Sequence, residues 1–410
     1  MDTCFEFVRI AITCFLHIFQ YSIGIQTYDN SVTALCNDLV HINVIYAKIL
    51  QWDIYKIFGS NEHINNHLKQ YNNNVPFDAE DDIDYTLLHQ IKQYAIQQNR
   101  CLTLENEFIP INSGTVALVF KGMLDDKPVV IKILRKNIHD KIDRGIRTVL
   151  TIIKSIHFIA SFFCTINDNT SNIIRGNHKI LMQQLDFNEE IKNNELFAKI
   201  SESYDFIKIP DIHKSFTTDV SNKIIVMEFF EGPSLTYLDN DSTFKHMYRD
   251  KIIKFILDSY VTHKCVHADL HTGNIIFTNE KIGLIDFGLV LQLTDKDAKH
   301  IVDIFFSIKN KNCDRLIMSI GKICSEDKMF LQQFRDSCAS TNVLLPLLAD
   351  NCACTSKVFA DILQIFNNIQ IPIESRGPTM ILSIVSCFSM IELMGGKDVA
   401  LDHVFKNFLK

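Results

Sequence analysis

The sequence predicts an α+β protein with two lobes, a small strand-rich lobe followed by a large helical lobe, and a helical extension at the N-terminus. Two β-branched runs flank the turn signal LDDKP within residues 108–134, which indicates a hairpin. Most of the remaining chain has apolar residues at three- and four-residue steps, as helices do. The expected domains are an apolar helix at 1–30, a helical extension at 31–100, a strand-rich lobe at 101–232 and a helical lobe at 233–410.

The first of these elements, residues 5–26, is apolar but interrupted by polar side chains. Glu6, Arg9 and His17 shorten the uninterrupted part below the ~20 predominantly apolar residues of a spanning helix. An amphipathic or buried helix is the favoured interpretation, and a membrane-surface or anchoring helix is the alternative. A secretory signal fits poorly because the first residues are not basic.

The next elements are helices with one connection between them. Residues 31–57 carry an apolar stripe of helical period, and residues 83–98 have helical spacing too. The polar tract at 59–82 contains Asn runs, Pro76 and an acidic cluster. This composition predicts a connection that contains one short helix.

Beyond the hairpin, helices and one further strand are expected. Residues 141–163 have helical spacing, and residues 181–200 predict a single amphipathic helix. Residues 223–232 are typical of a strand that ends in a Gly-Pro loop. The rest of the chain predicts helices up to Lys410, apart from the stretch CVHADLHTGNIIFTNEKIGLIDFGLV at 265–290.

The composition indicates an intracellular reducing compartment and argues against nucleic acid as a partner. The 410 residues carry a net charge of -7 with acidic and basic residues interspersed, so no basic face for a phosphate backbone is indicated. The 12 cysteines form no CxxC pair, which is typical of reduced thiols inside a cell. The oligomeric state is not indicated by these features.

The stretch at 265–290 has residues that phosphoryl transfer requires. That chemistry needs a cover over the phosphates, a strand lysine held by a helical carboxylate, a base, and two groups that hold magnesium. HADLHTGN followed by LIDFG supplies the base Asp269 and the magnesium ligands Asn274 and Asp286. A metal site built on the two histidines of HADLH is the simpler alternative, but no second His/Cys cluster in the sequence completes it.

The other parts lie upstream in the same order. Lys132 lies in VVIKIL, and Glu190 lies on the helix predicted at 181–200 as its partner. Magnesium suits oxygen ligands that ATP phosphates complete. The loop SGTVALVF is expected to cover the phosphates. The strand residue Met227 is expected at the back of the adenine pocket, and the backbone of the residues that follow it is expected to hydrogen-bond the adenine base. The expected ATP-binding set is Asn112, Ser113, Gly114, Thr115, Val116, Lys132, Met227, Glu228 and Phe230.

Together these motifs resemble the UbiB family of atypical protein-kinase-like proteins. HADLHTGN is similar to the family pattern HADxHxGN, and PINSGTVALVFKG is similar to its alanine-rich loop. In LDFNEE, Gln184 and Asp186 stand for the family's ExD motif. In YAKILQ, Lys48 and Gln51 stand for its N-terminal KxGQ motif, with Leu50 in place of glycine.

The resemblance implies a bilobal protein-kinase-like fold and a magnesium-dependent, ATP-binding atypical kinase or ATPase. It also implies a regulatory role for Lys48, Gln51, Gln184 and Asp186, because the family's KxGQ residues reach the ExD acids and obstruct peptide substrates. The family is tied to coenzyme Q (ubiquinone) biosynthesis, so an isoprenoid lipid or a membrane surface is the expected partner besides ATP. After DFG the sequence has no activation segment and no APE, which favours a lipid or small-molecule substrate.

Two other interpretations remain open. A small-molecule phosphotransferase resembling aminoglycoside or choline kinases would share HxDxxxxN and the later acid, but it would lack the helix that carries Lys48. A nucleotide-binding pseudokinase scaffold is disfavoured by the intact catalytic lysine and acids. It is kept open by Gln184 and Leu50, which depart from the family motifs.

Overall fold

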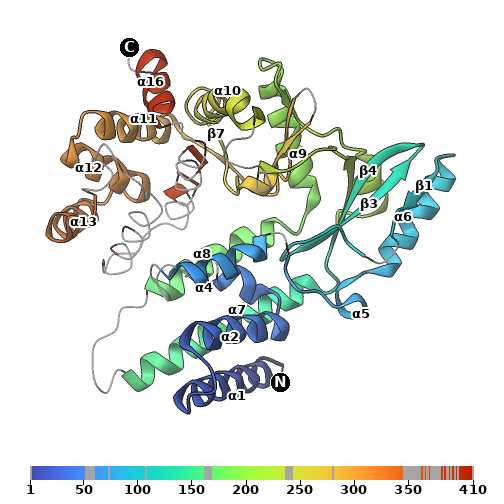
Figure 1. Cartoon of the computed structure of the whole chain (residues 1–410), viewed down its shortest axis with the longest axis horizontal. Coiled ribbons are helices and arrows are strands. Elements are labelled where there is room, and N and C mark those ends of the chain that lie inside the picture. Colours follow the sequence, from blue (N-terminus) through green and yellow to red (C-terminus); the bar gives the residue numbers. More distant parts are fainter. Residues whose placement is uncertain are drawn as a thin grey trace. The chain divides into compact units, whose positions relative to one another are not determined.

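The structure is a computed structural model that divides into two compact units (Figure 1). It describes residues 2–50, 61–72, 74–106, 109–160, 169–235, 243–278, 281–344 and 397–408, with single positions between 362 and 394. The first unit comprises Met1–Glu189 and Asp211–Phe229, and the second comprises Glu190–Pro210 and Phe230–Lys410. The mixture of helices and sheets confirms the predicted α+β class.

The first unit contains a five-stranded antiparallel sheet. Its strands follow the order β1-β3-β4-β6, and β2 also pairs with β3. The residues between β3 and β4, Asp125 and Asp126, have φ angles of 50° and 63°. This left-handed pair is what a type I′ hairpin turn requires, so the predicted hairpin is confirmed. The bounds are β1 (Leu102–Leu104), β2 (Asn112–Ser113), β3 (Ala117–Leu124), β4 (Lys127–Leu134) and β6 (Ile224–Glu228).

One face of this sheet is covered by helix α6 (Tyr85–Gln97), the helix predicted at 83–98 (Figure 1). Side chains on β3 alternate between buried and partly exposed positions, as a strand with one covered face requires. Leu87, Leu88 and Ile91 of α6 are buried in one cluster with Phe120 and Ile131 of the sheet. This cluster forms the core beneath the hairpin.

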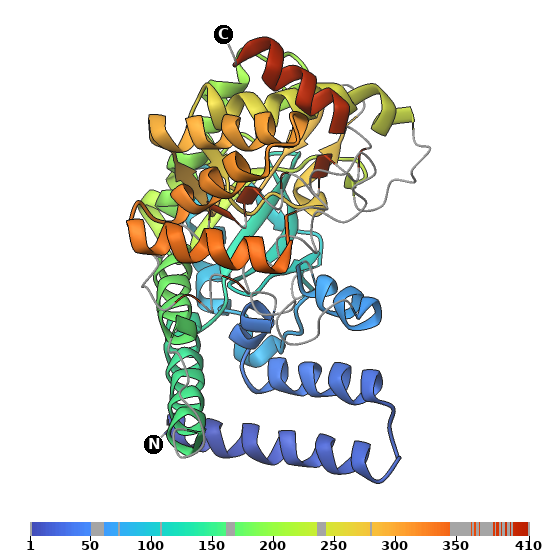
Figure 2. The ribbon, with the colours of Figure 1, turned by 90° about the vertical axis from the view of Figure 1, so that its left-hand side faces the viewer.

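A second group of helices in the first unit surrounds the N-terminus. Helix α1 (Asp2–Ser22) contacts both α2 (Tyr28–Ile42) and α7 (Ile138–Ala160), and Figure 2 shows α1 and α2 as a hairpin of helices. Gly145 allows α7 to approach the chain that follows α2, since a Cβ at this position would lie 2.2 Å from Cγ2 of Ile45. The other helices of this unit are α4 (Glu62–Lys69), η1 (Gln70–Asn72), α5 (Ala79–Asp82), α8 (Asn169–Gln183) and η2 (Phe216–Val220).

Three predicted helical segments differ from the structure. The stripe at 31–57 breaks after α2 at Asn43, whose extended backbone has φ -155°, and residues 45–50 form a separate helical segment. The tract at 59–82 contains α4, η1 and α5 rather than one short helix. The single helix predicted at 181–200 is wrong, because α8 ends at Gln183 and α9 begins at Phe187. The Asp186 carboxylate accepts the backbone N–H of Asn188 at 3.0 Å, a local bond that favours a new helix start over continuation.

The second unit is mainly helical, with two small sheets near its functional residues. Helix α9 (Phe187–Ser201) begins in the first unit, and its residues from Glu190 onward belong to the second. The two sheets have the orders β10-β7 and β5-β9-β8. A large apolar cluster joins the strands to helices α10 to α13 and α16. The bounds are β5 (Ile207–Lys208), α10 (Thr243–Val261), β7 (Cys265–His267), η4 (Thr272–Asn274), β8 (Ile275–Phe277), β9 (Ile282–Leu284), β10 (Val290–Gln292), α11 (Asp295–Lys309), α12 (Cys313–Cys324), α13 (Lys328–Thr341) and α16 (Lys397–Asn407).

Candidate active site

Strands β8 and β9 bring the two expected magnesium ligands to the same end of a hairpin. Ile275 pairs with Leu284, and the N–H of Ile285 donates to the carbonyl of Asn274 at 3.1 Å. Asn274 therefore lies directly before β8, opposite the residue that precedes Asp286. Two residues well separated in the sequence are thus held as neighbours by strand pairing.

The expected base, Asp269, is tied to this hairpin. The Nδ2 atom of the buried Asn274 donates to the backbone carbonyl of Asp269 at 2.9 Å. This bond occupies the amide nitrogen and leaves Oδ1 of Asn274 as the atom suited to a cation. The segment before Asp269 is held by β7 and β10, where Ala268 N–H donates to the carbonyl of Leu289 at 2.9 Å.

The backbone at Asp286 is left-handed, with φ 63°. This conformation is uncommon for a non-glycine residue, and such strained positions are concentrated at functional sites. The N–H of Gly288 donates to Oδ1 of Asp286 at 3.2 Å. A Cβ on Gly288 would lie 3.2 Å from this oxygen and 3.6 Å from Oε2 of Glu190, so the Glu190 carboxylate approaches the same turn.

Aromatic packing fixes the turn that carries Asp286. Phe287 is 1% exposed, and its ring lies 4.9 Å from Phe197 and 5.3 Å from His267. The Nδ2 atom of Asn193 donates to the carbonyl of Phe287 at 2.9 Å, which attaches the turn to α9. Phe287 therefore anchors the turn in the apolar core of the second unit.

His267 is part of this packed cluster rather than a ligand poised for a cation. Burial lowers the pKa of His267, while the nearby Asp286 carboxylate acts in the opposite direction. Its Nε2 atom lies 3.4 Å from the carbonyl of Ile285. A buried, neutral imidazole fits a structural role beside the catalytic loop.

Lys132 occupies the predicted position on a central strand of the first unit. It pairs with Val119 of β3 and Ile225 of β6, and it is buried. Its Nζ atom lies 5.5 Å from the centre of the Phe187 ring, at the start of α9. An ammonium held over an aromatic face is stabilised by the ring quadrupole.

The expected phosphate cover SGTVALVF includes the end of β2 and the turn that leads to β3, and residues 112–116 are the part of this region expected to bind ATP. Gly114 N–H donates to the carbonyl of Ala117 at 2.9 Å, and Ser113 Oγ donates to the carbonyl of Val75 at 2.6 Å. Arg135 Nε donates to the carbonyl of Gly114 at 3.0 Å. Arg135 carries no signal in the sequence, because its main partner Asp82 lies 53 residues away and no motif joins them.

The expected adenine-binding residues lie at the end of β6 and just after it. Met227 pairs with Val130 and is buried. The N–H groups of Glu228 and Phe229 donate to the carbonyls of Asp211 at 2.9 Å and Pro128 at 3.2 Å. Those two donors are therefore used within the first unit. Phe230, the last residue of the expected set, belongs to the second unit.

The residues expected to be regulatory are described only in part. Lys48 is half-buried in the helical segment 45–50, whereas Gln51 lies outside the described residues. Gln184 lies in the turn after α8, where its N–H donates to the carbonyl of Leu181 at 3.1 Å. Asp186 directly precedes α9, so the ExD-like pair occupies the break between two helices.

The first unit carries a buried strand lysine. The second unit carries an aspartate, an asparagine and a further aspartate at the ends of paired strands. Residues of these types are typical of a kinase-like phosphotransferase. The family model described as "ABC1 atypical kinase-like domain" matches residues 84–320, and the chain belongs to this family. The match confirms the kinase-like fold, the enzyme class and the predicted UbiB resemblance.

Named relatives agree with this assignment. The chain is 22% identical over 52% of its length to "Protein ACTIVITY OF BC1 COMPLEX KINASE 8, chloroplastic" of Arabidopsis thaliana, covering 28% of that protein. It is 26% identical over 47% of its length to "AarF domain-containing protein kinase 1" of Xenopus laevis, covering 37%. It is 25% identical over 51% of its length to "Probable protein kinase UbiB" of Xylella fastidiosa, covering 39%. The chain thus spans well under half the length of these relatives.

A solved structure was also found, titled "The complex structure of Rv3197-erythromycin from Mycobacterium tuberculosis". It aligns over 91% of this chain and 97% of its own, with a TM-score of 0.43 and 15% identity. The family assignment rests on the family model and the named relatives rather than on this alignment.

Proposed function

We propose that the chain is a magnesium-dependent atypical kinase or ATPase that acts on or near isoprenoid lipids rather than on proteins. The observation that carries this proposal is the grouping of Asp269, Asn274 and Asp286 by two pairs of strands, with Asp286 in a left-handed backbone. Both proposed metal ligands offer oxygen atoms, which is the donor type that Mg²⁺ prefers. When bound, Mg²⁺ would neutralise phosphate charge as it builds up.

Each residue has a distinct part in this proposal. Asp269 accepts the proton of the attacking hydroxyl or water, and Asn274 and Asp286 hold the metal through oxygen. Lys132 binds the phosphates, and Glu190 is proposed as the carboxylate that orients it. The turn at 112–116 covers the phosphates from the first unit.

Helix α1 supports a lipid surface as the place of action. Over Thr3–Ser22 the helix is long and apolar enough to cross a membrane, with a mean hydropathy of 1.3, and most of this segment is not buried. Phe5 and Phe15 are 68% and 66% exposed, whereas the polar residues Glu6 and His17 are buried against the protein. Two of the three interruptions noted in the sequence, Glu6 and His17, therefore face inward, whereas Arg9 is exposed.

The carboxylate of Glu6 is matched by partners inside the first unit. It lies 2.9 Å from Nε of Arg144, and it accepts the hydroxyl of Tyr46 at 2.5 Å. Because α1 turns its acidic residue inward and its apolar side chains outward, we propose that its outer face contacts lipid.

The test is nucleotide binding and turnover by the full chain, with and without liposomes. Wild type is expected to bind ATP only with Mg²⁺, and Asp286→Asn is expected to lose this Mg²⁺-dependent binding. Asp314→Asn is the control, since Asp314 is an exposed carboxylate of the same unit that pairs with Arg335 at the surface. Metal-independent binding equal in all three proteins would contradict the proposal.

The same assay separates the remaining alternatives. Turnover that ignores liposomes but responds to aminoalcohols or amino sugars would identify a small-molecule phosphotransferase. Metal-dependent binding without any turnover, unchanged in Asp269→Asn, would identify a pseudokinase.

A further inference from the structure

Arg135, the residue that follows β4, is almost fully buried, and the proposed chemistry does not use it. Its guanidinium donates on one side to the phosphate-covering turn, from Nε to the carbonyl of Gly114 at 3.0 Å and from Nη2 to Oγ of Ser113 at 2.7 Å. On the other side it donates from Nη1 to Oδ2 of Asp82 at 2.6 Å. The planar fork of arginine thus joins two segments that are distant in the sequence.

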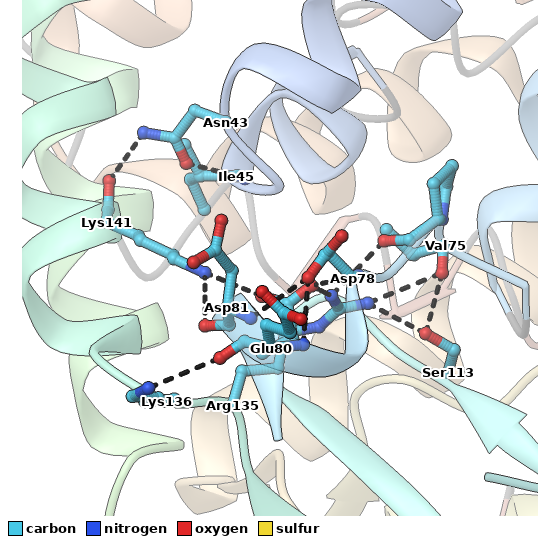
Figure 3. A network of polar contacts seen from close by, with 12 residues as sticks. Asn43, Ile45, Val75, Asp78, Glu80, Asp81, Ser113, Arg135, Lys136 and Lys141 are labelled. Atoms are coloured by element: carbon cyan, nitrogen blue, oxygen red, sulfur yellow. Dashed lines mark hydrogen bonds and ion pairs between the residues drawn. The ribbon is translucent and has the colours of Figure 1, made fainter. Parts of the chain in front are cut away.

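The second segment, residues 75–82, is itself held firmly. Arg135 also donates to the carbonyls of Val75 at 3.4 Å and Pro76 at 3.2 Å. Asp82 accepts Nζ of Lys141 at 2.6 Å through its other oxygen. The carboxylate of Asp82 therefore joins Lys141 of α7 to Arg135. Figure 3 shows Arg135 beside Ser113 and Val75.

A buried ion pair alone would be a structural feature, because removing either partner leaves an unpaired charge. Burial lowers the pKa of Arg135, and the Asp82 carboxylate counteracts this effect. Beyond the ion pair, the guanidinium gives two donors to the segment 112–116. This segment is also held by backbone bonds, from Val75 N–H to the Ser113 carbonyl at 2.8 Å and from Arg135 N–H to the Val116 carbonyl at 2.9 Å. The bond from Nε to the Gly114 carbonyl adds a side-chain contact at the centre of the turn.

We propose that Arg135 is a positioning residue, which holds the backbone of residues 112–116 in the conformation that binds nucleotide phosphates. Asp82 in turn fixes the guanidinium of Arg135 through their ion pair. This inference rests on the proposed function and deepens it. Removing the guanidinium should weaken the binding of a nucleotide more, the more of its phosphates the turn contacts. Binding of the nucleoside alone should not change.

The test compares Arg135→Lys with Arg315→Lys. Arg315 is the control for an arginine-to-lysine change elsewhere in the chain, because its partly exposed side chain pairs with Asp303 and lies over the Phe306 ring, 4.1 Å from its centre, in the second unit. The probes are ATP, ADP and adenosine, each titrated with Mg²⁺ in excess. Arg135→Lys is expected to raise the Kd for ATP about tenfold, because hydrogen bonds from a charged group are lost, and to leave the Kd for adenosine within about twofold.

An equal loss for ATP and adenosine would mean that Arg135 only stabilises the fold, and an unchanged Kd for ATP would overturn the proposal as well. If Arg135→Lys does not fold, Asp82→Asn is the second variant, because Asp82 anchors the same fork and lies outside the expected ATP-binding set. A rise of about threefold in the Kd for ATP is then expected, and no rise contradicts the proposal.

Hydrogen exchange of the nucleotide-free protein separates this inference from the proposed function. The amides of residues 114–116 are expected to exchange at least about tenfold faster in Arg135→Lys than in wild type, and at the wild-type rate in Arg315→Lys. Faster exchange in a protein that binds no nucleotide would refute the proposed function and keep the positioning role. Unchanged exchange would refute the positioning role whatever the protein binds.

Discussion

Replacing Glu6 with Gln should destabilise the first unit by about 2 kcal/mol. The carboxylate accepts the hydroxyl of Tyr46 at 2.5 Å and Nδ2 of Asn43 at 3.2 Å, and it lies 2.9 Å from Nε of Arg144. A glutamine at position 6 has one carbonyl acceptor and one NH₂ group. Its NH₂ group would therefore face one of the donors that now bind the carboxylate, and no hydrogen bond would form there. Hydrogen bonds to a charged group contribute about 1.5–3 kcal/mol each, but the Arg144 side chain is 35% exposed and its share is reduced by solvent.

The assay is thermal unfolding followed by near-UV circular dichroism, together with a urea titration. A loss of about 2 kcal/mol in a unit of this size lowers Tm by about 4–8 °C. The control is Asp38→Asn. Asp38 is an exposed carboxylate on α2 that contacts His17 on α1, the helix that carries Glu6. This change should alter the free energy of unfolding by less than about 0.5 kcal/mol. Equal Tm values for Glu6→Gln and Asp38→Asn would refute the reasoning that the Glu6 cluster is a buried, matched site.

The packing of three single residues leads to further expected outcomes. Gly145→Ala should lower the free energy of unfolding by about 1–3 kcal/mol in a urea titration. The added Cβ would lie 2.2 Å from Cγ2 of Ile45, and the cost of this overpacking exceeds the gain in helix propensity. A more stable variant would show that the chain after α2 moves to accommodate the added methyl group. Gly114→Ala should keep the wild-type Tm, since its Cβ would meet only the carbonyl of Ala117 at 3.4 Å; a fall of several degrees would show that the turn cannot hold a side chain. Because burial lowers the pKa of His267 in the folded state, its stabilising contribution is present above about pH 6.5 and is lost as pH falls below that value toward the folded-state pKa. Urea titrations from about pH 8 to about pH 5 should therefore show a smaller loss of stability in His267→Gln than in wild type, and parallel curves would count against this.

Local signals in the sequence predicted those parts of the fold that depend on neighbouring residues. The LDDKP turn predicted the hairpin because Asp125 and Asp126 adopt the left-handed backbone that such turns need. The break before α9 was missed because the apolar spacing continues through residues 184–186, while the bond from Asn188 N–H to Asp186 that starts the new helix leaves no trace in periodicity.

The candidate site was likewise predictable only where it depends on residues that are near one another in the sequence. Asp269, Asn274 and Asp286 lie in one contiguous motif, and strand pairing over short distances brings them together. Arg135 and Asp82 meet only through the tertiary fold, and a charged residue after a strand is usually solvated. Their pairing could not be inferred from spacing.

The inward-facing Glu6 has a practical consequence for protein production. Deleting α1 to obtain a chain that needs no detergent would remove the exposed phenylalanines, but it would also leave Tyr46 without its acceptor and Arg144 without its ion-pair partner. Tyr46 lies two positions before Lys48, at the beginning of the helical segment 45–50. Activities measured on such a shortened protein would report a disturbed Lys48 region, so replacing Phe5 and Phe15 by polar residues is the better route to a soluble sample.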